Sequence, residues 1–364
     1  MKYFKKACIT FISLFIMLTV LAQQKNYSAI HAKVDSFIHL QMEQKNMAGL
    51  SLAVLREGKI ILAKGYGYAN LEHKVPANKN TVYLMASVTK TFVAAATMML
   101  VEEGRISLQD TIGKYVPELP SHWNIVTIQQ LLSHTSGIKG SNDWPPPCKT
   151  EIKYDNYNYT RADVINETAC MPLSFTPGEK WEYSGRGYYV LGMLIEAVSG
   201  KTFEQFLKEK IFDPLQMNNT RMIDNRAIIP NRAAGYQKEN NHFVNKIIPQ
   251  DPIVEFSDGG LVSTVIDMSK WDAALYAGKL LKKETLQLMF TPVKIKDGFA
   301  PYGLGFGTTP FQGHQRVGHI GRIPGFESAF SRFIDDKISV VVFINTELDA
   351  GQMDLANKIA SFYF

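Results

Sequence analysis

LSLAVLREGKIILAKGYG, residues 50–67, is the segment from which the fold can be worked out. Apolar side chains dominate residues 50–55, and Glu57-Gly58 is a typical turn pair. Residues 59–67 return with strand-forming side chains, so the segment predicts an antiparallel β-hairpin. Apolar residues recur at helical spacing just upstream, and this predicts an amphipathic helix over 28–44.

The C-terminal end of the chain also has strand patterns, whereas the middle favours helices. The economical topology brings the two ends into one antiparallel sheet, with helices on its faces and a mainly helical block inserted over roughly 106–290. The predicted fold class is therefore α/β of the α+β type. The expected strands are 303–308, 315–319, 326–334 and 338–345; the expected helices are 87–103, 127–132, 187–198, 202–211, 263–277 and 353–364.

The first residues have the pattern of a secretion signal. Lys2, Lys5 and Lys6 precede an apolar run over 7–22 that ends in small residues, so 1–22 is expected to be a signal peptide and 23–364 the catalytic domain of a secreted, periplasmic or cell-envelope protein. The run is about 16 residues, shorter than the roughly 20 of a membrane span, although a retained anchor stays an alternative. No later segment is expected to cross a membrane.

The charge balance excludes one class of partner. The net charge is +5, and removal of the three signal lysines leaves +2 (5 − 3), with no basic cluster that would predict nucleic-acid binding. Cys148 and Cys170 remain after the signal, and in an oxidising compartment they can form a disulfide worth roughly 3 kcal/mol. Two unpaired thiols are the alternative. No metal site is expected, and the polar, proline-containing segment 141–159 is expected to be a surface loop over a cleft.

Ser87-Val88-Thr89-Lys90 is the first candidate for chemistry. Residues i and i+3 share a helix face, so Lys90 can lie beside Ser87 at a helix start, where free N–H groups favour an oxyanion. A lysine shielded from water can activate a serine hydroxyl. The alternative is a helix-capping Ser87 with a solvated Lys90. Ser136 and Lys139 give a second match to the same spacing.

Two further motifs lie later in the chain. Tyr183-Ser184-Gly185 stands just before a predicted helix, and a tyrosine near a lysine can relay a proton, although a core tyrosine is the more common case. His319-Ile320-Gly321 follows a strand pattern and continues with Arg322; the glycine permits close approach of the backbone to a ligand.

With these three motifs in this order, the chain from about Gly49 to its C-terminus resembles the family of class C β-lactamases, D,D-peptidases, D-aminopeptidases and related esterases. The linking phrases 131–138, 232–236 and 259–264 support the resemblance. Ser136 falls in the first of them and is discarded as a nucleophile. The resemblance implies a β-lactamase/transpeptidase-like fold that needs no cofactor.

The resemblance also implies a role for each motif residue. Ser87 would be the acylated nucleophile, Lys90 would accept its proton, and Tyr183 would be the partner acid/base. His319 would take the first position of the third motif. The oxyanion hole would be formed by the backbone N–H groups of Ser87 and of Arg322, which follows Gly321.

Two positions depart from the family pattern. Gly185 stands where the second motif usually has an asparagine, so an interaction worth about 1 to 3 kcal/mol is absent. His319 stands where a lysine usually binds a substrate carboxylate, and a histidine is mostly neutral at pH 7. Arg322 is a candidate to supply that charge instead. Both departures weaken the case for an efficient β-lactamase.

The expected function is therefore a secreted serine hydrolase that acts through an acyl-enzyme on a small-molecule or peptide substrate. D-amino-acid peptides, cell-wall fragments and small esters are the expected substrates, with specificity in the loops around 141–170 and 236–258. The alternatives are a β-lactamase proper and a non-catalytic, penicillin-binding-like protein that binds but does not turn over.

Overall fold

A six-stranded antiparallel sheet forms the centre of the molecule, with strand order β11-β12-β13-β1-β2-β3. The computed structural model describes residues 27–140, 148, 160–240, 242–246, 256–348 and 351–364. The predicted signal 1–22 and nearly all of the predicted loop 141–159 lie outside them. The strands are β1 (Gly49–Arg56), β2 (Lys59–Asn70), β3 (Val75–Pro76), β11 (Arg316–Ile323), β12 (Phe326–Phe333) and β13 (Ile338–Ile344).

The two ends of the chain meet at the centre of this sheet. β1 pairs with β13, placing Leu50 opposite Ile344, and on its other side β1 forms the predicted hairpin with β2. The expected α/β fold with an antiparallel sheet from both chain ends is therefore confirmed. β13 is buried along its whole length, which explains why all of its residues except Ser339 are apolar.

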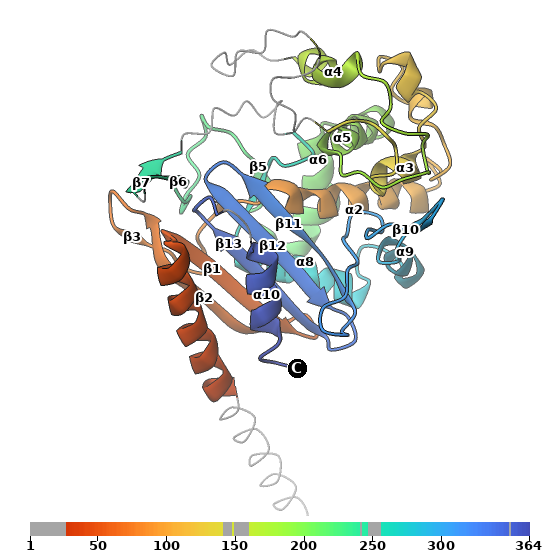
Figure 1. Ribbon diagram of the computed structural model, residues 1–364. Helices are drawn as coiled ribbons and strands as arrows, with labels where there is room; N and C mark the ends of the chain where they lie inside the picture. Colours follow the sequence, from red (N-terminus) through yellow and green to blue (C-terminus); the bar gives the residue numbers. More distant parts are fainter. Residues whose placement is uncertain (1–26, 141–147, 149–159, 241, 247–255, 349–350) are drawn as a thin grey trace, which may run out of the picture.

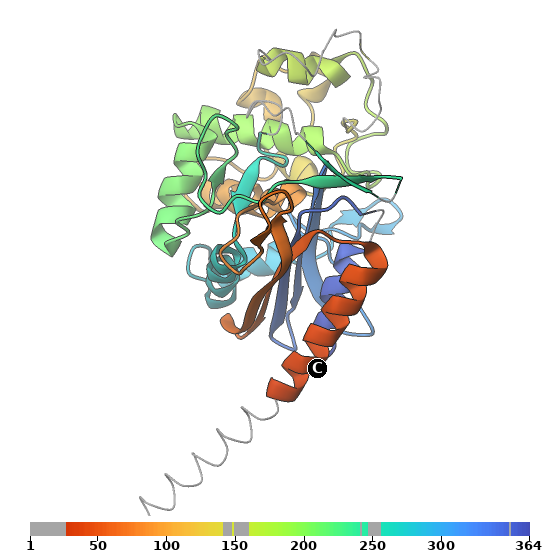
Figure 2. The ribbon, with the colours of Figure 1, turned by 90° about the vertical axis from the view of Figure 1, so that its left-hand side faces the viewer.

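Helices cover both faces of the sheet (Figure 1). Helix 27–45 and α10 (Gln352–Ala360) pack on one face through Val34, Ile359 and the even-numbered valines of β13. α2 (Thr89–Glu102) and α8 (Val265–Ala277) pack on the other face with Val341. Figure 2 shows helix 27–45 and α10 on the same side of the sheet. The alternation of strand side chains thus builds two cores.

The middle of the chain is mainly helical, as expected. Thr127 and Thr202 begin their helices with capping boxes, and Ser184 caps α5, which ends at the left-handed Gly200. The elements are η1 (Ala86–Val88), η2 (Ile112–Lys114), η3 (Ser121–Trp123), α3 (Ile128–Leu132), α4 (Arg161–Ala169), α5 (Gly185–Ser199), α6 (Phe203–Leu207), η4 (Lys208–Phe212, a π-helical turn), α7 (Asp213–Leu215) and α9 (Lys283–Met289).

Three small sheets complete the architecture. β8 (Leu261–Ser263) lies between β4 (Tyr83–Leu84) and β5 (Arg221–Met222), and β4 comes directly before η1 in the chain. The other two are hairpins: β6 (Tyr236–Glu239) with β7 (His242–Asn245), and β9 (Lys294–Ile295) with β10 (Gly298–Phe299).

The strand predicted over 303–308 is wrong. The segment is a loop that makes only isolated bridges, from Gly307 to Tyr302 and to Gly318. Its glycines explain the difference. A Cβ on Gly303 would lie 2.2 Å from the Met289 carbonyl oxygen, and Gly305, at a φ of +86°, approaches α2. The glycines therefore serve close packing and not strand pairing.

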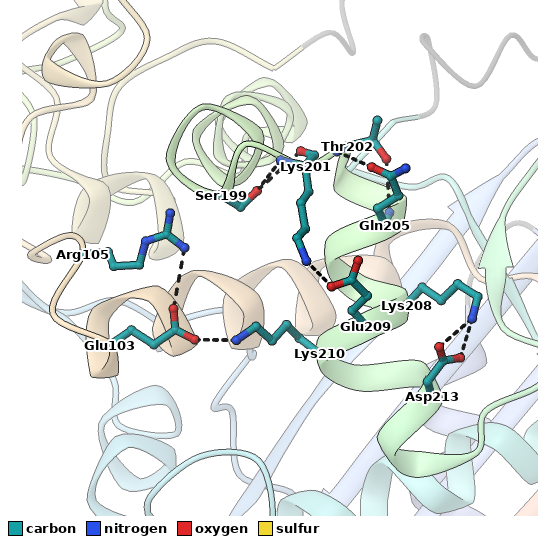
Figure 3. Close-up of polar contacts among 10 residues, drawn as sticks. All are labelled: Glu103, Arg105, Ser199, Lys201, Thr202, Gln205, Lys208, Glu209, Lys210 and Asp213. Carbon is teal, nitrogen blue, oxygen red and sulfur yellow. Dashed lines mark hydrogen bonds and ion pairs between the residues drawn. The ribbon is translucent and has the colours of Figure 1, made fainter.

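Exposed ion pairs join the end of α2 to the turn after α6 (Figure 3). Lys210 Nζ lies 2.7 Å from Glu103 Oε1, and Arg105 approaches the other oxygen of Glu103. Such exposed pairs contribute roughly 0–1 kcal/mol each. The packing of Phe92 on Phe212, with ring centroids 5.8 Å apart, fixes the two elements more firmly because these rings are buried.

Cys148 and Cys170 are joined by a disulfide, which ties the C-terminal end of α4 to residue 148. Among the described residues, no helix combines the length and the apolar character needed to cross a bilayer.

Candidate active site

The candidate nucleophile and base lie together at the start of α2. Ser87 is in η1 and Lys90 follows one turn later, with a side chain that is 1% exposed. Lys90 Nζ donates hydrogen bonds to Ser87 Oγ at 3.1 Å and to the Asp258 carbonyl oxygen at 2.5 Å. The structure therefore places Lys90 in the interior beside Ser87 and not in solvent.

The backbone before Ser87 is held by two strands. The Met85 N–H donates to the Leu261 carbonyl of β8 at 2.8 Å, and Ser328 Oγ of β12 donates to the Met85 carbonyl at 2.6 Å. Ala86 has a φ of +48°, an unfavourable value for a residue with a Cβ. Such strain persists only where the surroundings fix it, so Ser87 sits on a rigidly held turn.

The edge strand β11 lies directly against this turn. A Cβ on Gly321 would be 2.1 Å from the Met85 carbonyl oxygen and 3.0 Å from the Ser87 nitrogen. Only glycine permits this approach. The sequence predicted that the motif of His319, Gly321 and Arg322 follows a strand. In the structure, all three residues lie inside β11.

Tyr183 comes to the same place from the loop before α5. Lys90 Nζ lies 5.2 Å from the centroid of the Tyr183 ring. The Tyr183 ring lies 4.3 Å from that of His134, whose Nδ1 accepts a hydrogen bond from the Ser184 N–H at 3.1 Å. His134 therefore fixes the backbone at Ser184, the residue that follows Tyr183. Because Nδ1 accepts, the proton of a neutral His134 ring is on Nε2.

The two histidines of the site are neutral. Burial and the charge of Lys90 lower the pKa of His319 to about 3, and the same two causes hold the pKa of His134 well below its usual value. Burial also raises the pKa of Tyr302, whose ring lies 4.7 Å from that of His134. These groups therefore contribute no charge at pH 7.

The Arg322 side chain lies on the other face of β11. His319 and Gly321 are buried, whereas Arg322 is exposed, as strand alternation requires. Its guanidinium donates to the Leu348 carbonyl at 2.7 Å and lies 3.6 Å from Glu327 Oε1. The expectation that this side chain supplies a charge for the substrate is therefore corrected, because the arginine is turned away from Ser87.

Sequence reasoning missed Asp258 and His134. Asp258 directly precedes the phrase Gly259–Thr264, and His134 lies within the phrase 131–138. Both phrases pointed to the site, although neither residue type at such a position indicates a role by itself. Burial raises the pKa of the Asp258 carboxyl, while the charges of Lys90 and Arg186 oppose that shift. Gly185 lies against this carboxyl.

Comparison with known proteins gives the family. The beta-lactamase family model matches residues 34–361. The putative penicillin-binding protein PbpX of Bacillus subtilis is 31% identical over 308 residues, covering 84% of this chain and 73% of that protein.

Two solved structures resemble most of the chain. The octameric penicillin-binding protein homologue of Pyrococcus abyssi is 30% identical, with a TM-score of 0.77 and coverage of 91% of this chain and 76% of that one. The D-stereospecific amidohydrolase of a Streptomyces species is 25% identical, with a TM-score of 0.71 and coverage of 87% and 94%. The chain therefore belongs to the beta-lactamase family and is a serine hydrolase of the β-lactamase-related type.

Proposed function

We propose that this chain hydrolyses amide or ester bonds through an acyl-enzyme on Ser87. The hydrogen bond from the buried Lys90 Nζ to Ser87 Oγ, at 3.1 Å, is the observation that supports this most strongly. A serine hydroxyl needs an adjacent base to become a nucleophile, and a water-shielded amine one helical turn away can serve as one.

The proposed reaction has two halves. Ser87 Oγ attacks the carbonyl carbon as its proton passes to the neutral amine form of Lys90, and the resulting oxyanion is bound by the backbone N–H groups of Ser87 and Arg322. Breakage of the scissile bond expels an amine or alcohol, which takes a proton through Tyr183. Water then attacks the acyl carbon and releases Ser87 with its proton restored.

The charges around the site support uncharged or cationic substrates over β-lactams. His319 is neutral because its pKa is lowered to about 3, and the Arg322 guanidinium contacts Glu327. A substrate carboxylate would find no cation at either position. D-amino-acid peptides, other small amides and esters are therefore the proposed substrates.

Labelling with a fluorophosphonate, followed by intact mass measurement, tests the proposal. One label per chain is expected on the natural protein and none on Ser87→Ala. Ser136→Ala is the matched control, because Ser136 has the same S-x-x-K spacing, and it should label fully. A folded natural protein that stays unlabelled on long incubation would favour the non-catalytic alternative.

Export is a separate part of the proposal. The basic, apolar and small-residue order of residues 1–22 supports it, and an oxidising compartment suits the Cys148–Cys170 disulfide. A C-terminally tagged full chain should appear outside the cytoplasm with about 22 residues removed. An unshortened chain in the membrane fraction would instead indicate a retained anchor.

A further inference from the structure

The carboxyl group of Asp258 fills the space that the missing side chain of residue 185 leaves. Gly185 is the first residue of α5, and a Cβ built on it would lie 3.1 Å from Asp258 Oδ2. An asparagine at this position would press against the carboxylate. The site therefore has an acid where the family pattern has a neutral amide.

Asp258 is held firmly in this place. Its carbonyl oxygen accepts the hydrogen bond from Lys90 Nζ. The preceding Ser257 is buried, and its Oγ donates to the Tyr188 carbonyl of α5 at 2.9 Å. A Cβ on Gly192 would lie 2.1 Å from Ser257 Oγ, so a glycine in α5 allows the loop to dock. The loop that carries Asp258 is therefore fixed to α5 through Ser257 and to α2 through the hydrogen bond from Lys90.

Its carboxyl group makes no ion pair among the residues that the structure describes. Asp258 Oδ1 is buried and has no hydrogen-bond partner there. Lys90 Nζ is directed at Ser87 Oγ and the Asp258 carbonyl, and the Arg186 guanidinium pairs with Glu167. A buried acceptor without a partner is unfavourable, and a donor from a ligand would relieve this cost.

Residue 258 also lies on the partly exposed side of the site. Ser87, Tyr183, Gly185 and Asp258 are each partly exposed, whereas Lys90 is buried. The Asp258 carbonyl and Ser87 Oγ both accept from the same Lys90 Nζ, so residue 258 lies beside the attacking oxygen. A substrate bound at Ser87 therefore comes close to Asp258.

We propose that Asp258 is a specificity-determining residue that binds the ammonium group of the substrate. The hydrolase then prefers amides and esters of amino acids, or peptides with a free amino terminus, over N-acylated or anionic compounds. This inference rests on the proposed acyl-enzyme function and names its substrate class. Charge-assisted hydrogen bonds to a fixed carboxylate supply the preference.

The test compares kcat/KM for alanine p-nitroanilide with kcat/KM for its N-acetylated form, in both D and L series, at pH 7. The natural enzyme should favour the free amine by at least about tenfold, and Asp258→Asn should reduce this ratio by about ten- to hundredfold. Any general effect of the substitution on acylation enters both constants and cancels in the ratio. Asp258→Glu, which keeps the charge, should retain part of the preference.

Two controls need no assumption about the folding of these variants. Asp297→Asn makes the same charge change at an exposed turn and should leave the ratio as it is. In the natural enzyme, the preference should fade as pH rises through about 8, where an α-amino group loses its proton.

An enzyme that the fluorophosphonate can label, but that in its unlabelled form shows no preference for the free amine or does not turn it over, overturns this inference alone. An Asp258→Asn ratio equal to that of the natural enzyme does the same. A folded natural protein that cannot be labelled overturns the proposed function and this inference with it.

Discussion

At the scale of single residues, the site depends on one buried amine among neutral rings. The centroids of the Tyr183 and Tyr188 rings lie 5.2 Å and 5.6 Å from Lys90 Nζ. The charge of Lys90 also helps to lower the pKa values of His319 and His134. These rings shield the amine from water without competing for its proton. We therefore propose Lys90 and Tyr183 as the groups that carry out the acid–base chemistry.

Lys90→Met should remove most of the activity while keeping the volume of the side chain. A positioned acid or base contributes about 10²- to 10⁴-fold, so kcat/KM for an activated ester should fall by this factor. Lys139→Met, from the discarded second match, should stay near the natural rate. Activity of Lys90→Met close to that of the natural enzyme would mean that another group activates Ser87.

His319→Gln should change how stability depends on pH. The folded state keeps this imidazole neutral down to about pH 3, whereas the unfolded chain protonates near 6.5. Between these two pH values the unfolded state thus binds more protons than the folded state. The stability that the neutral His319 contributes is therefore lost as pH falls. Between pH 7 and pH 5 the variant should lose roughly 2 kcal/mol less free energy of unfolding than the natural protein. Urea unfolding at the two pH values measures these free energies. An equal loss in the variant and in the natural protein would contradict the prediction.

At the scale of elements, the close approach of β11 to η1 builds the proposed oxyanion hole. β11 is the edge strand of the sheet, so its outer side is open to the turn that carries Ser87. Gly321 makes this approach possible, and Ser328 of the neighbouring strand holds the Met85 carbonyl.

Gly321→Ala should therefore impair catalysis more than folding. The new methyl group would collide with the Met85 carbonyl at 2.1 Å and push β11 away from the Ser87 nitrogen. Loss of an oxyanion-hole donor costs about 10²- to 10³-fold in kcat, and this loss is expected here. Gly313→Ala is the control, because a Cβ at that position meets nothing within 4 Å, and its kcat should stay unchanged. A small loss of stability is expected there, because Gly313 has a positive φ. Unchanged kcat in Gly321→Ala would argue against the proposed hole.

At the scale of the whole molecule, a buried ion pair fastens the inserted block to the sheet from the chain ends. Arg332 of β12 and Asp272 of α8 have side chains 3% and 1% exposed, with Nε and Oδ1 2.6 Å apart. Ser339 of β13 donates to the same carboxylate oxygen at 2.8 Å. The pair therefore joins elements that are far apart in the sequence.

Asp272→Asn should lower the free energy of unfolding by roughly 3–5 kcal/mol, because it leaves the arginine charge buried and unpaired. The double variant Asp272→Leu/Arg332→Met should lose much less, since it removes both charges. Denaturant unfolding of both variants measures the difference. A double variant less stable than the single variant would contradict the prediction. It would show that the ion pair stabilises the folded protein by more than the cost of burying its two charges.

The local pattern of the sequence was enough to predict the main elements and to single out the candidate nucleophile. Alternating apolar residues and turn pairs gave β1, β2, β12 and β13, and the order of the motifs gave Ser87, Lys90 and Tyr183. These features are encoded within a few neighbouring residues, because strand alternation and helix spacing are local properties of the backbone.

What only the tertiary structure decided depends on contacts between distant segments. Residues 303–308 have a strand pattern, but packing against Met289 and α2 makes them a loop. Asp258 meets Gly185 from 73 residues away (258 − 185), and the side of β11 that Arg322 occupies follows from its strand register. The reason is physical: burial and charge pairing are set by neighbours in space, and no local pattern specifies which distant segment those neighbours come from.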